Sequence, residues 1–247
     1  MMCMKNVMWL FLSIFIMING CAPTFSEFQS ADLVGTGNMA FTPYMSTTSS
    51  DEDGDSDDGA DDLDGGEEDV SLTGDIQDSK GLLFAYGLND KFDIHLKYEQ
   101  IDADGGFIEG SVMGAGIKYQ FLNNGKHRFS GLLPISQIGQ TMSMPDLSME
   151  GDGGSSSTTN KYTTIEPTLL GSSNVFKNID VNYSAKMIVK VSGDDTEEDS
   201  GFAFNFSGSI PMPKLDYITV IPEYGIFKTG DHTFNHSGIG LAVRLNM

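Results

Sequence analysis

Cysteine and basic residues are scarce in this chain, and both shortages limit what the protein can be. The only cysteines are Cys3 and Cys21, and the first lies in a segment that reads as an export signal, so the mature chain has no disulfide framework. Lysine and arginine number 14 against 35 aspartates and glutamates, which gives a formal net charge of −21. This balance disfavours binding to nucleic-acid phosphates.

A helical period of 3.6 residues is also missing from residues 32–247. Stretches of roughly ten residues instead alternate between apolar and polar side chains, which is the pattern of a strand with two unlike faces. The clearest example is 92–99, where aromatic and aliphatic residues alternate with charged residues and a histidine. The sequence predicts ten such strands, at about 33–48, 81–89, 91–101, 110–122, 127–140, 160–174, 178–192, 201–212, 216–229 and 235–247.

The connections between these strands alternate in length. Short ones, such as Asn89-Asp90 and 123–126, alternate with longer polar ones, such as 49–79 and 141–159. The pair Asn124-Gly125 favours a type I′ hairpin. Brief periplasmic turns and long outer loops are typical of outer-membrane barrels, and an even strand count returns both chain ends to the periplasm. The fold predicted is all-β: an antiparallel up-and-down transmembrane β-barrel of about 10 strands, with long acidic loops outside the cell.

The N-terminus reads as an export signal. Lys5 precedes a nearly unbroken apolar run at 7–18, which at about twelve residues is too short for a typical membrane-spanning helix. The tetrapeptide Ile18-Asn19-Gly20-Cys21 then resembles the bacterial lipobox, although Asn19 departs from its usual small or apolar residue. The resemblance implies a lipid on Cys21, inserted in the inner leaflet. The alternative is a simple secretory signal with an incidental cysteine.

These features divide the chain into a signal peptide at 1–20, a lipid-anchored linker at 21–31 and a barrel at 32–247, with 49–79 as an acidic, unstructured extracellular loop. The mature chain resembles the small outer-membrane barrels of Gram-negative bacteria in pattern rather than by a diagnostic motif. Those barrels commonly end in an aromatic residue, whereas this chain ends in Met247. A soluble barrel tethered by its lipid is the competing structure.

The alternation also predicts which side chains face the lumen. Opposite charges occur there in similar number, so an ionic plug that stabilises the barrel is the first interpretation, and a narrow path for solutes or ions is the second. The predicted lumen charge network consists of Asp93, His95, Lys97, Glu99, Lys118, Glu166, Lys186, Lys190, Glu223 and Arg244.

Catalytic motifs are lacking. Omptins, the outer-membrane proteases, are also ten-stranded, and their activity implies an Asp-x-His pair facing an acidic pair at the outer rim. Asp93-Ile94-His95 matches that triplet but starts its predicted strand after a short turn, so it lies at the end opposite Asp102 and Asp104. No Gly-x-Ser-x-Gly or paired-cysteine pattern occurs. We therefore expect no enzyme activity. His236 lies just past the last outer loop, and we expect its side chain to be exposed.

The segment 49–79 holds 14 acidic residues and no basic one. It is too charged and too poor in apolar residues to pack, so it is predicted to be a solvated loop. Asp51, Asp53 and Asp55 resemble the start of a calcium loop, and weak association of Ca²⁺ or Mg²⁺ there is the alternative. No other cofactor is expected.

The function predicted is that of a non-catalytic outer-membrane barrel with a structural or surface-interaction role. A narrow channel for small solutes or ions is the second hypothesis, and a lipid-anchored soluble barrel that binds a small ligand is the third. Membrane lipid and divalent cations are the expected partners. The sequence identifies no protein partner, and we expect a monomer.

Overall fold

The computed structural model describes residues 26–50, 77–103, 108–145, 155–176, 178–193, 200–230 and 232–246. Strands make up most of these residues. They are β1 (Met39–Ser50), β2 (Gln77–Asn89), β3 (Phe92–Ala103), β4 (Ile108–Asn123), β5 (His127–Pro145), β6 (Ser155–Ile165), β7 (Thr168–Phe176), β8 (Ile179–Gly193), β9 (Ser200–Met212), β10 (Leu215–Thr229) and β11 (His232–Leu245). No helix in the described ranges is long and apolar enough to cross a membrane.

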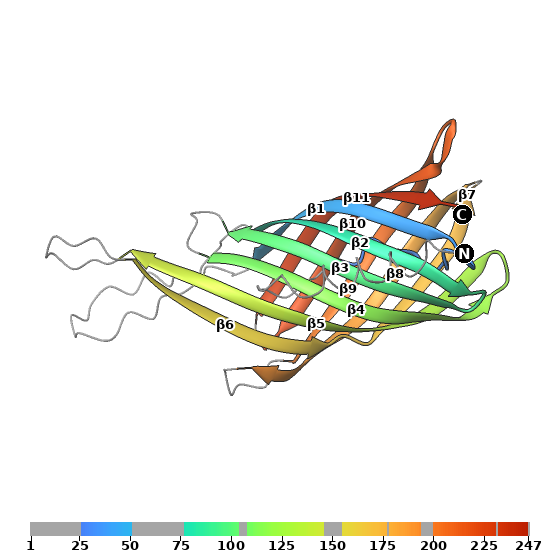
Figure 1. Ribbon diagram of the computed structural model, residues 1–247. Coiled ribbons are helices and arrows are strands. Elements are labelled where there is room, and N and C mark those ends of the chain that lie inside the picture. The colour runs from blue at the N-terminus through green and yellow to red at the C-terminus, as the bar shows by residue number, and fades with distance from the viewer. Residues whose placement is uncertain are drawn as a thin grey trace, which may run out of the picture.

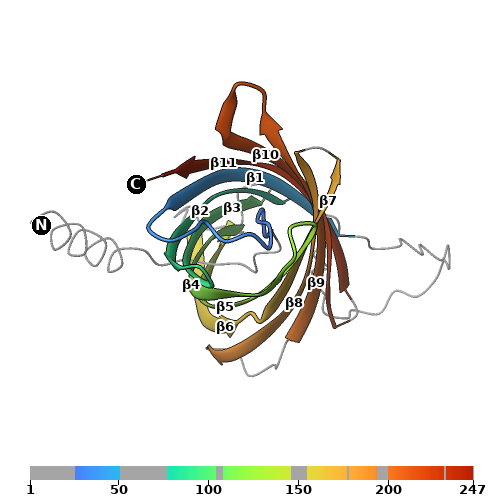
Figure 2. The same ribbon diagram turned by 90° about the vertical axis from the view of Figure 1, so that its right-hand side faces the viewer.

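The strands form one sheet that closes on itself (Figures 1 and 2). Every pairing is antiparallel, and β1 closes the wall against β11, with Met39 opposite Leu245. Strands β6 and β7 are two parts of one crossing, because both pair with β5 on one side and with β8 on the other. The wall therefore has ten crossings, and the prediction of a closed antiparallel barrel of about ten strands is confirmed.

The interruption between β6 and β7 lies at Glu166-Pro167, within the crossing predicted at 160–174. Proline has no N–H to donate to a neighbouring strand, so it breaks the hydrogen-bond ladder at this point. The Glu166 N–H still donates to the Pro134 carbonyl at 3.0 Å, and the Met187 N–H donates to the Pro167 carbonyl at 3.1 Å. The wall thus continues across the break in the same register.

The two faces of the wall differ as the alternation predicts. On β9, Phe202, Phe204 and Phe206 are each more than half exposed on the outside, whereas the alternating residues 203, 205 and 207 are buried inside. On β3, Asp93 and Glu99 are buried inside the barrel. An apolar exterior around a polar interior is what a barrel needs when lipid surrounds it.

The barrel has two unlike ends. We call the end with the short connections 90–91 and 124–126 the turn end, and the opposite end the loop end (right and left in Figure 1). At 124–126 the type I′ prediction is wrong. Only Gly125 has a positive φ, of 81°, and the Asn124 side chain instead accepts hydrogen bonds from the N–H groups of Lys126 and His127.

Apolar side chains line parts of the lumen nearer the loop end. Ile101, Val112 and Ile138 pack together on one wall, with Tyr162 against them. Ile188, which breaks the alternation of its strand, packs with Ala203 and Phe227 in a second cluster, with Phe234 against it. The exception in the sequence pattern therefore marks an apolar part of an otherwise polar interior.

Candidate functional site

The N-terminal residues 26–34 lie inside the barrel, and we call them the lumenal segment (Figure 2, blue trace). Phe28 and Ala31 have no exposed surface. The sequence analysis instead predicts a linker at 21–31 and a first strand from residue 33. The described part of that linker is buried in the lumen, and β1 begins only at Met39.

Lumen side chains bind the backbone of the lumenal segment in place of a neighbouring strand. The N–H groups of Ala31 and Val34 donate to Ser172 Oγ and Asp93 Oδ2, each at 2.8 Å. The carbonyl oxygens of the segment accept hydrogen bonds from lysine and glutamine side chains. Lys97 Nζ donates to the Ser26 carbonyl at 2.8 Å, and Gln120 Nε2 donates to the Ala31 carbonyl at 2.8 Å. Lys118 Nζ donates to the carbonyls of Ser30 and Asp32 at 2.7 and 2.6 Å. Because backbone groups lose water when buried, these bonds are needed for the segment to remain inside.

A carboxylate binds the segment where its backbone bends at Phe28. The N–H groups of Glu27 and Phe28 donate to the two carboxylate oxygens of Glu223 at 2.8 and 2.7 Å. Phe28 has a φ of 39°, in the left-handed region that bulky residues rarely adopt. Successive N–H groups that converge around such a bend make an anion-binding concavity. Glu223 also contacts His236 Nε2 at 3.2 Å.

The Phe28 ring packs in a recess of the wall. It stacks on Tyr44 with 4.7 Å between ring centroids, and Leu83, Ile221 and Ala242 complete the cluster. Two lumen-facing glycines of β11 leave the space that the ring needs. A Cβ atom at Gly238 would lie 2.6 Å from Phe28 Cζ, and one at Gly240 would lie 3.1 Å from Cδ1.

Two ion-pair groups bind the segment, a buried one just before Phe28 in the sequence and a partly buried one after it. Lys186 Nζ pairs with the Glu27 carboxylate and, at 3.5 Å, with Glu166 Oε2. Burial raises the pKa of Glu27, but the ammonium groups of Lys186 and Lys97 outweigh burial and lower the pKa overall. Glu27 is therefore charged at neutral pH.

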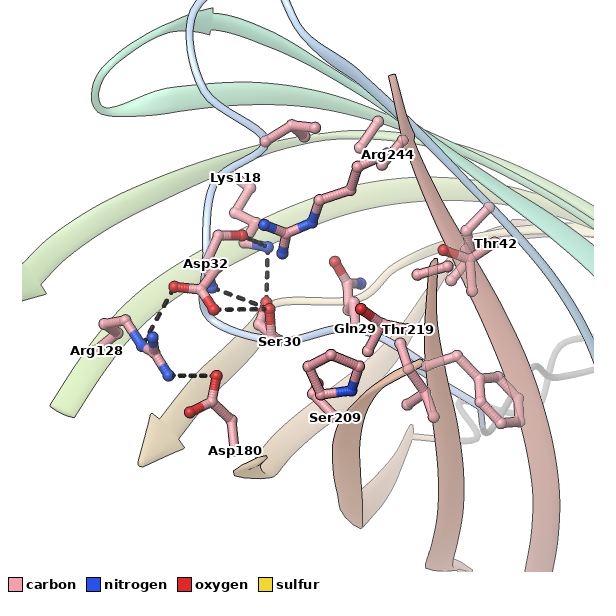
Figure 3. A pocket seen from close by; sticks show the side chains of 18 of the residues that line it. Gln29, Ser30, Asp32, Thr42, Lys118, Arg128, Asp180, Ser209, Thr219 and Arg244 are labelled. Carbon is pink, nitrogen blue, oxygen red and sulfur yellow. Dashed lines mark hydrogen bonds and ion pairs between the residues drawn. The ribbon is translucent and has the colours of Figure 1, made fainter. Parts of the chain in front are cut away.

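The second group lies toward the turn end. Arg128 Nε contacts Asp32 Oδ1 at 3.2 Å, and a terminal nitrogen of the same guanidinium contacts Asp180 Oδ2 at 2.8 Å (Figure 3). Between the two groups, Ala31 packs against Leu132 and Leu170. The segment thus contacts charged, polar and apolar groups from several strands.

The predicted lumen charge network is distributed around this segment. Asp93, Lys97, Lys118, Lys186 and Glu223 bind it directly, as described above. Glu99 accepts from Tyr44 Oη at 2.8 Å and Glu166 from Thr164 Oγ1 at 2.8 Å. Lys190 Nζ lies over the Tyr162 ring, 5.4 Å from its centroid. His95 and Arg244 line a cavity near the turn end.

Sequence reasoning missed several partners. His236 is buried beside Glu223, so the expectation that it is exposed is wrong. Arg128 and Asp180 stand at lumen-facing positions of predicted strands, and their parity could have identified them. Glu27 and Asp32 precede the first strand in a segment without periodicity, so no comparable signal exists for them.

The other predicted sites lie elsewhere. Asp93 and His95 stand near the turn end of β3, and Asp102 stands at the other end of that strand. Cys21, Asp51, Asp53 and Asp55 fall outside the described residues, as does Asp104. Within the described ranges, no group of three or more His, Cys, Asp or Glu side chains could hold a metal ion.

No protein-family model and no curated protein sequence matches the chain. Solved structures are similar in fold at low identity. The translocator domain of the autotransporter NalP from Neisseria meningitidis has a TM-score of 0.49 and 8% identity over 98% of this chain and 95% of its own. The outer membrane protease OmpT from Escherichia coli has a TM-score of 0.49 and 10% identity over 89% and 100%. The outer membrane protein OprG from Pseudomonas aeruginosa has a TM-score of 0.36 and 14% identity over 85% and 99%.

Proposed function

We propose that this protein is a non-catalytic outer-membrane barrel that closes its lumen with its own N-terminal segment and serves a structural or surface-interaction role. The observation that supports this most is the lumenal segment itself. Its backbone N–H and carbonyl groups are bound by side chains of β3, β4, β7 and β10. A segment held in this way is part of the folded interior rather than a loose chain in a pore.

The membrane placement follows from the two faces of the wall. Exposed phenylalanines on β9 would be unfavourable in water, and the closed ladder leaves no sheet edge to be hydrogen-bonded by solvent. Together with the predicted export signal, this favours integration in the outer membrane over a soluble, lipid-tethered barrel. A Cys21→Ser variant is therefore expected to remain in carbonate-washed membranes, and its release into the soluble fraction would support the tethered alternative.

The lack of a catalytic role is supported by the positions of the two omptin-like residues. The Asp93 carboxylate accepts the Val34 N–H, and His95 Nε2 lies 3.9 Å from it. Both are enclosed at the turn end, whereas the related protease chemistry implies groups at the outer rim. Asp93 thus positions the lumenal segment in this proposal.

A channel is the second candidate, because the segment is held by noncovalent contacts and a cavity of about 340 Å³ lies next to it at the turn end. Release of the segment would widen the interior of the barrel. A closed structural barrel does not conduct ions at rest, whereas a channel does.

Planar-bilayer recording separates them. The native chain is expected to give no regular conductance steps, together with a heat-modifiable band on gels that shows a folded barrel. The double variant Glu27→Gln, Asp32→Asn removes one carboxylate from each ion-pair group and is expected to show openings. Glu109→Gln, an exposed substitution on β4, is the matched control and should stay silent. Regular steps from the native chain would contradict the closed barrel and support the channel.

A further inference from the structure

The cavity near the turn end has the size and lining of a small-molecule site. Its volume of about 340 Å³ lies within the usual range for ligand pockets. The lumenal segment forms one side through Gln29, Ser30 and Asp32, and the barrel wall forms the rest. A solute from the turn-end side would therefore meet both the wall and the segment that fills the lumen.

The positive groups around this cavity differ in how many hydrogen-bond and ion-pair partners they have. Arg128 is neutralised by Asp32 and Asp180. Lys118 Nζ donates to two carbonyl oxygens, which leaves one of its three N–H groups and its full charge without a carboxylate in contact. Arg244 has no hydrogen bond or ion pair to any described residue, and Figure 3 shows its guanidinium beside the Lys118 ammonium.

A third polar group faces the same space. His95 lines the cavity and is only 9% exposed, and its Nε2 has no hydrogen-bond partner among the described residues. A buried ring nitrogen without a hydrogen-bond partner is unfavourable, and an anion bound in this cavity would be attracted by both cations. The hydroxyl groups of Thr42 and Thr219 add neutral donors to the lining.

We infer that this cavity binds a small oxyanion, a carboxylate or a phosphate, with Arg244 as its main ligand and Lys118 and His95 beside it. A guanidinium binds such groups through two parallel N–H donors, which makes Arg244 the most specific contact. The carboxylates that line the cavity do not occupy this position, because Arg128 holds Asp32 and Asp180, and Asp216 is exposed at the rim. The site is independent of whether the barrel conducts.

Binding of inorganic phosphate to the full chain in detergent tests the site by calorimetry. The native protein is expected to bind one phosphate saturably, with a dissociation constant in the range of about 1 mM or below. Arg244→Gln is expected to weaken binding by roughly tenfold or more, and Arg244→Lys to weaken it less, because charge remains but the two-donor fork is lost. Lys91→Gln removes a cation at the same end but outside the cavity and should bind as the native chain does.

A second readout covers the folding of the variants. Phosphate is expected to raise the unfolding temperature of the native chain and of Lys91→Gln, but not of Arg244→Gln. Without phosphate, Arg244→Gln should be about as stable as the native chain, because Arg244 is exposed and has no hydrogen bond or ion pair to any described residue. Competition by acetate would assign the site to carboxylates as well as phosphates. Absence of saturable binding below about 10 mM, or equal affinity in Arg244→Gln, would overturn the inference.

Discussion

Phe28 combines an unfavourable backbone angle with a fully buried ring. Its φ of 39° costs energy that the Glu223 hydrogen bonds and the stacking on Tyr44 must offset. The residue is therefore expected to keep the lumenal segment in place, and the two glycines of β11 show that the wall is shaped around it.

Replacing Phe28 with alanine should release the lumenal segment. Removal of a buried phenylalanine costs about 3–5 kcal/mol in protein cores, which corresponds to a change of two orders of magnitude or more in the docking equilibrium. We expect the barrel to stay folded and to show frequent openings in planar bilayers. Phe206→Ala, which removes an outward-facing ring, should stay closed. A silent Phe28→Ala variant would show that the ring does not hold the segment.

The pairing of Glu27 with Lys186 can be measured by a double-mutant cycle. Residues in contact commonly show coupling energies of 0.5–3 kcal/mol, and we expect about 1–3 kcal/mol here because both groups are buried. The cycle uses Glu27→Gln, Lys186→Met and the double variant, with the urea midpoint as readout. Since folding lowers the Glu27 pKa, its contribution is present above the ordinary glutamate pKa and is lost as the pH falls through the folded value. A coupling energy near zero at neutral pH would show that the Glu27–Lys186 ion pair does not stabilise the fold.

Parity in the sequence assigns a residue to a face but does not name its partner. Asp93 could be placed inside the barrel because its neighbours in sequence, Phe92 and Ile94, are apolar. That it binds the N–H of Val34 could not be predicted, since Val34 falls at the start of the first predicted strand, 33–48, and is therefore expected in the wall. The polar groups of residues 26–34 are bound by several different strands of the wall. The segment therefore has no regular alternation, and its position in the lumen could not be predicted from the sequence.

At the scale of the elements, strand positions were predictable because each crossing needs a similar length of alternating residues. The least regular crossing is the one that contains Pro167. From Thr164 in β6 through the start of β7 the register with β8 is unchanged across Pro167, so we attribute the break to the missing N–H.

Substitution of Pro167 by valine should join β6 to β7. The new N–H would face Met187, which already donates to the carbonyl of residue 167. We expect slower amide exchange at Thr168 to Leu170, measured by hydrogen–deuterium exchange with mass spectrometry. Pro213→Val lies in the turn between β9 and β10, outside the ladders, and is expected to leave exchange at Thr168 to Leu170 unchanged. Unchanged or faster exchange in Pro167→Val would show that more than the missing donor interrupts the strand.

At the scale of the whole molecule, the lumenal segment has a direction. Val34 is bound by Asp93, the second residue of β3 at the turn end, and Phe28 is bound by Glu223, near the middle of β10. Ser26 Oγ lies 3.1 Å from Ser46 Oγ, in the loop-end half of β1. Read from Val34 back to Ser26, the chain therefore advances through the barrel from the turn end toward the loop end.

With the turn end in the periplasm, as the connection lengths predict, this direction predicts on which side of the membrane an insertion before Ser26 is reached. In a Cys21→Ser background, where no lipid constrains the N-terminus, an epitope inserted directly before Ser26 should bind antibody on intact cells. The same epitope placed after Asn246, at the turn end, should bind only after the outer membrane is disrupted. The insertion adjoins the lumenal segment directly, so no intervening residues could return it past the length of the barrel to the turn end. An epitope before Ser26 that reacts only in disrupted cells would mean that the segment leaves the lumen in the membrane.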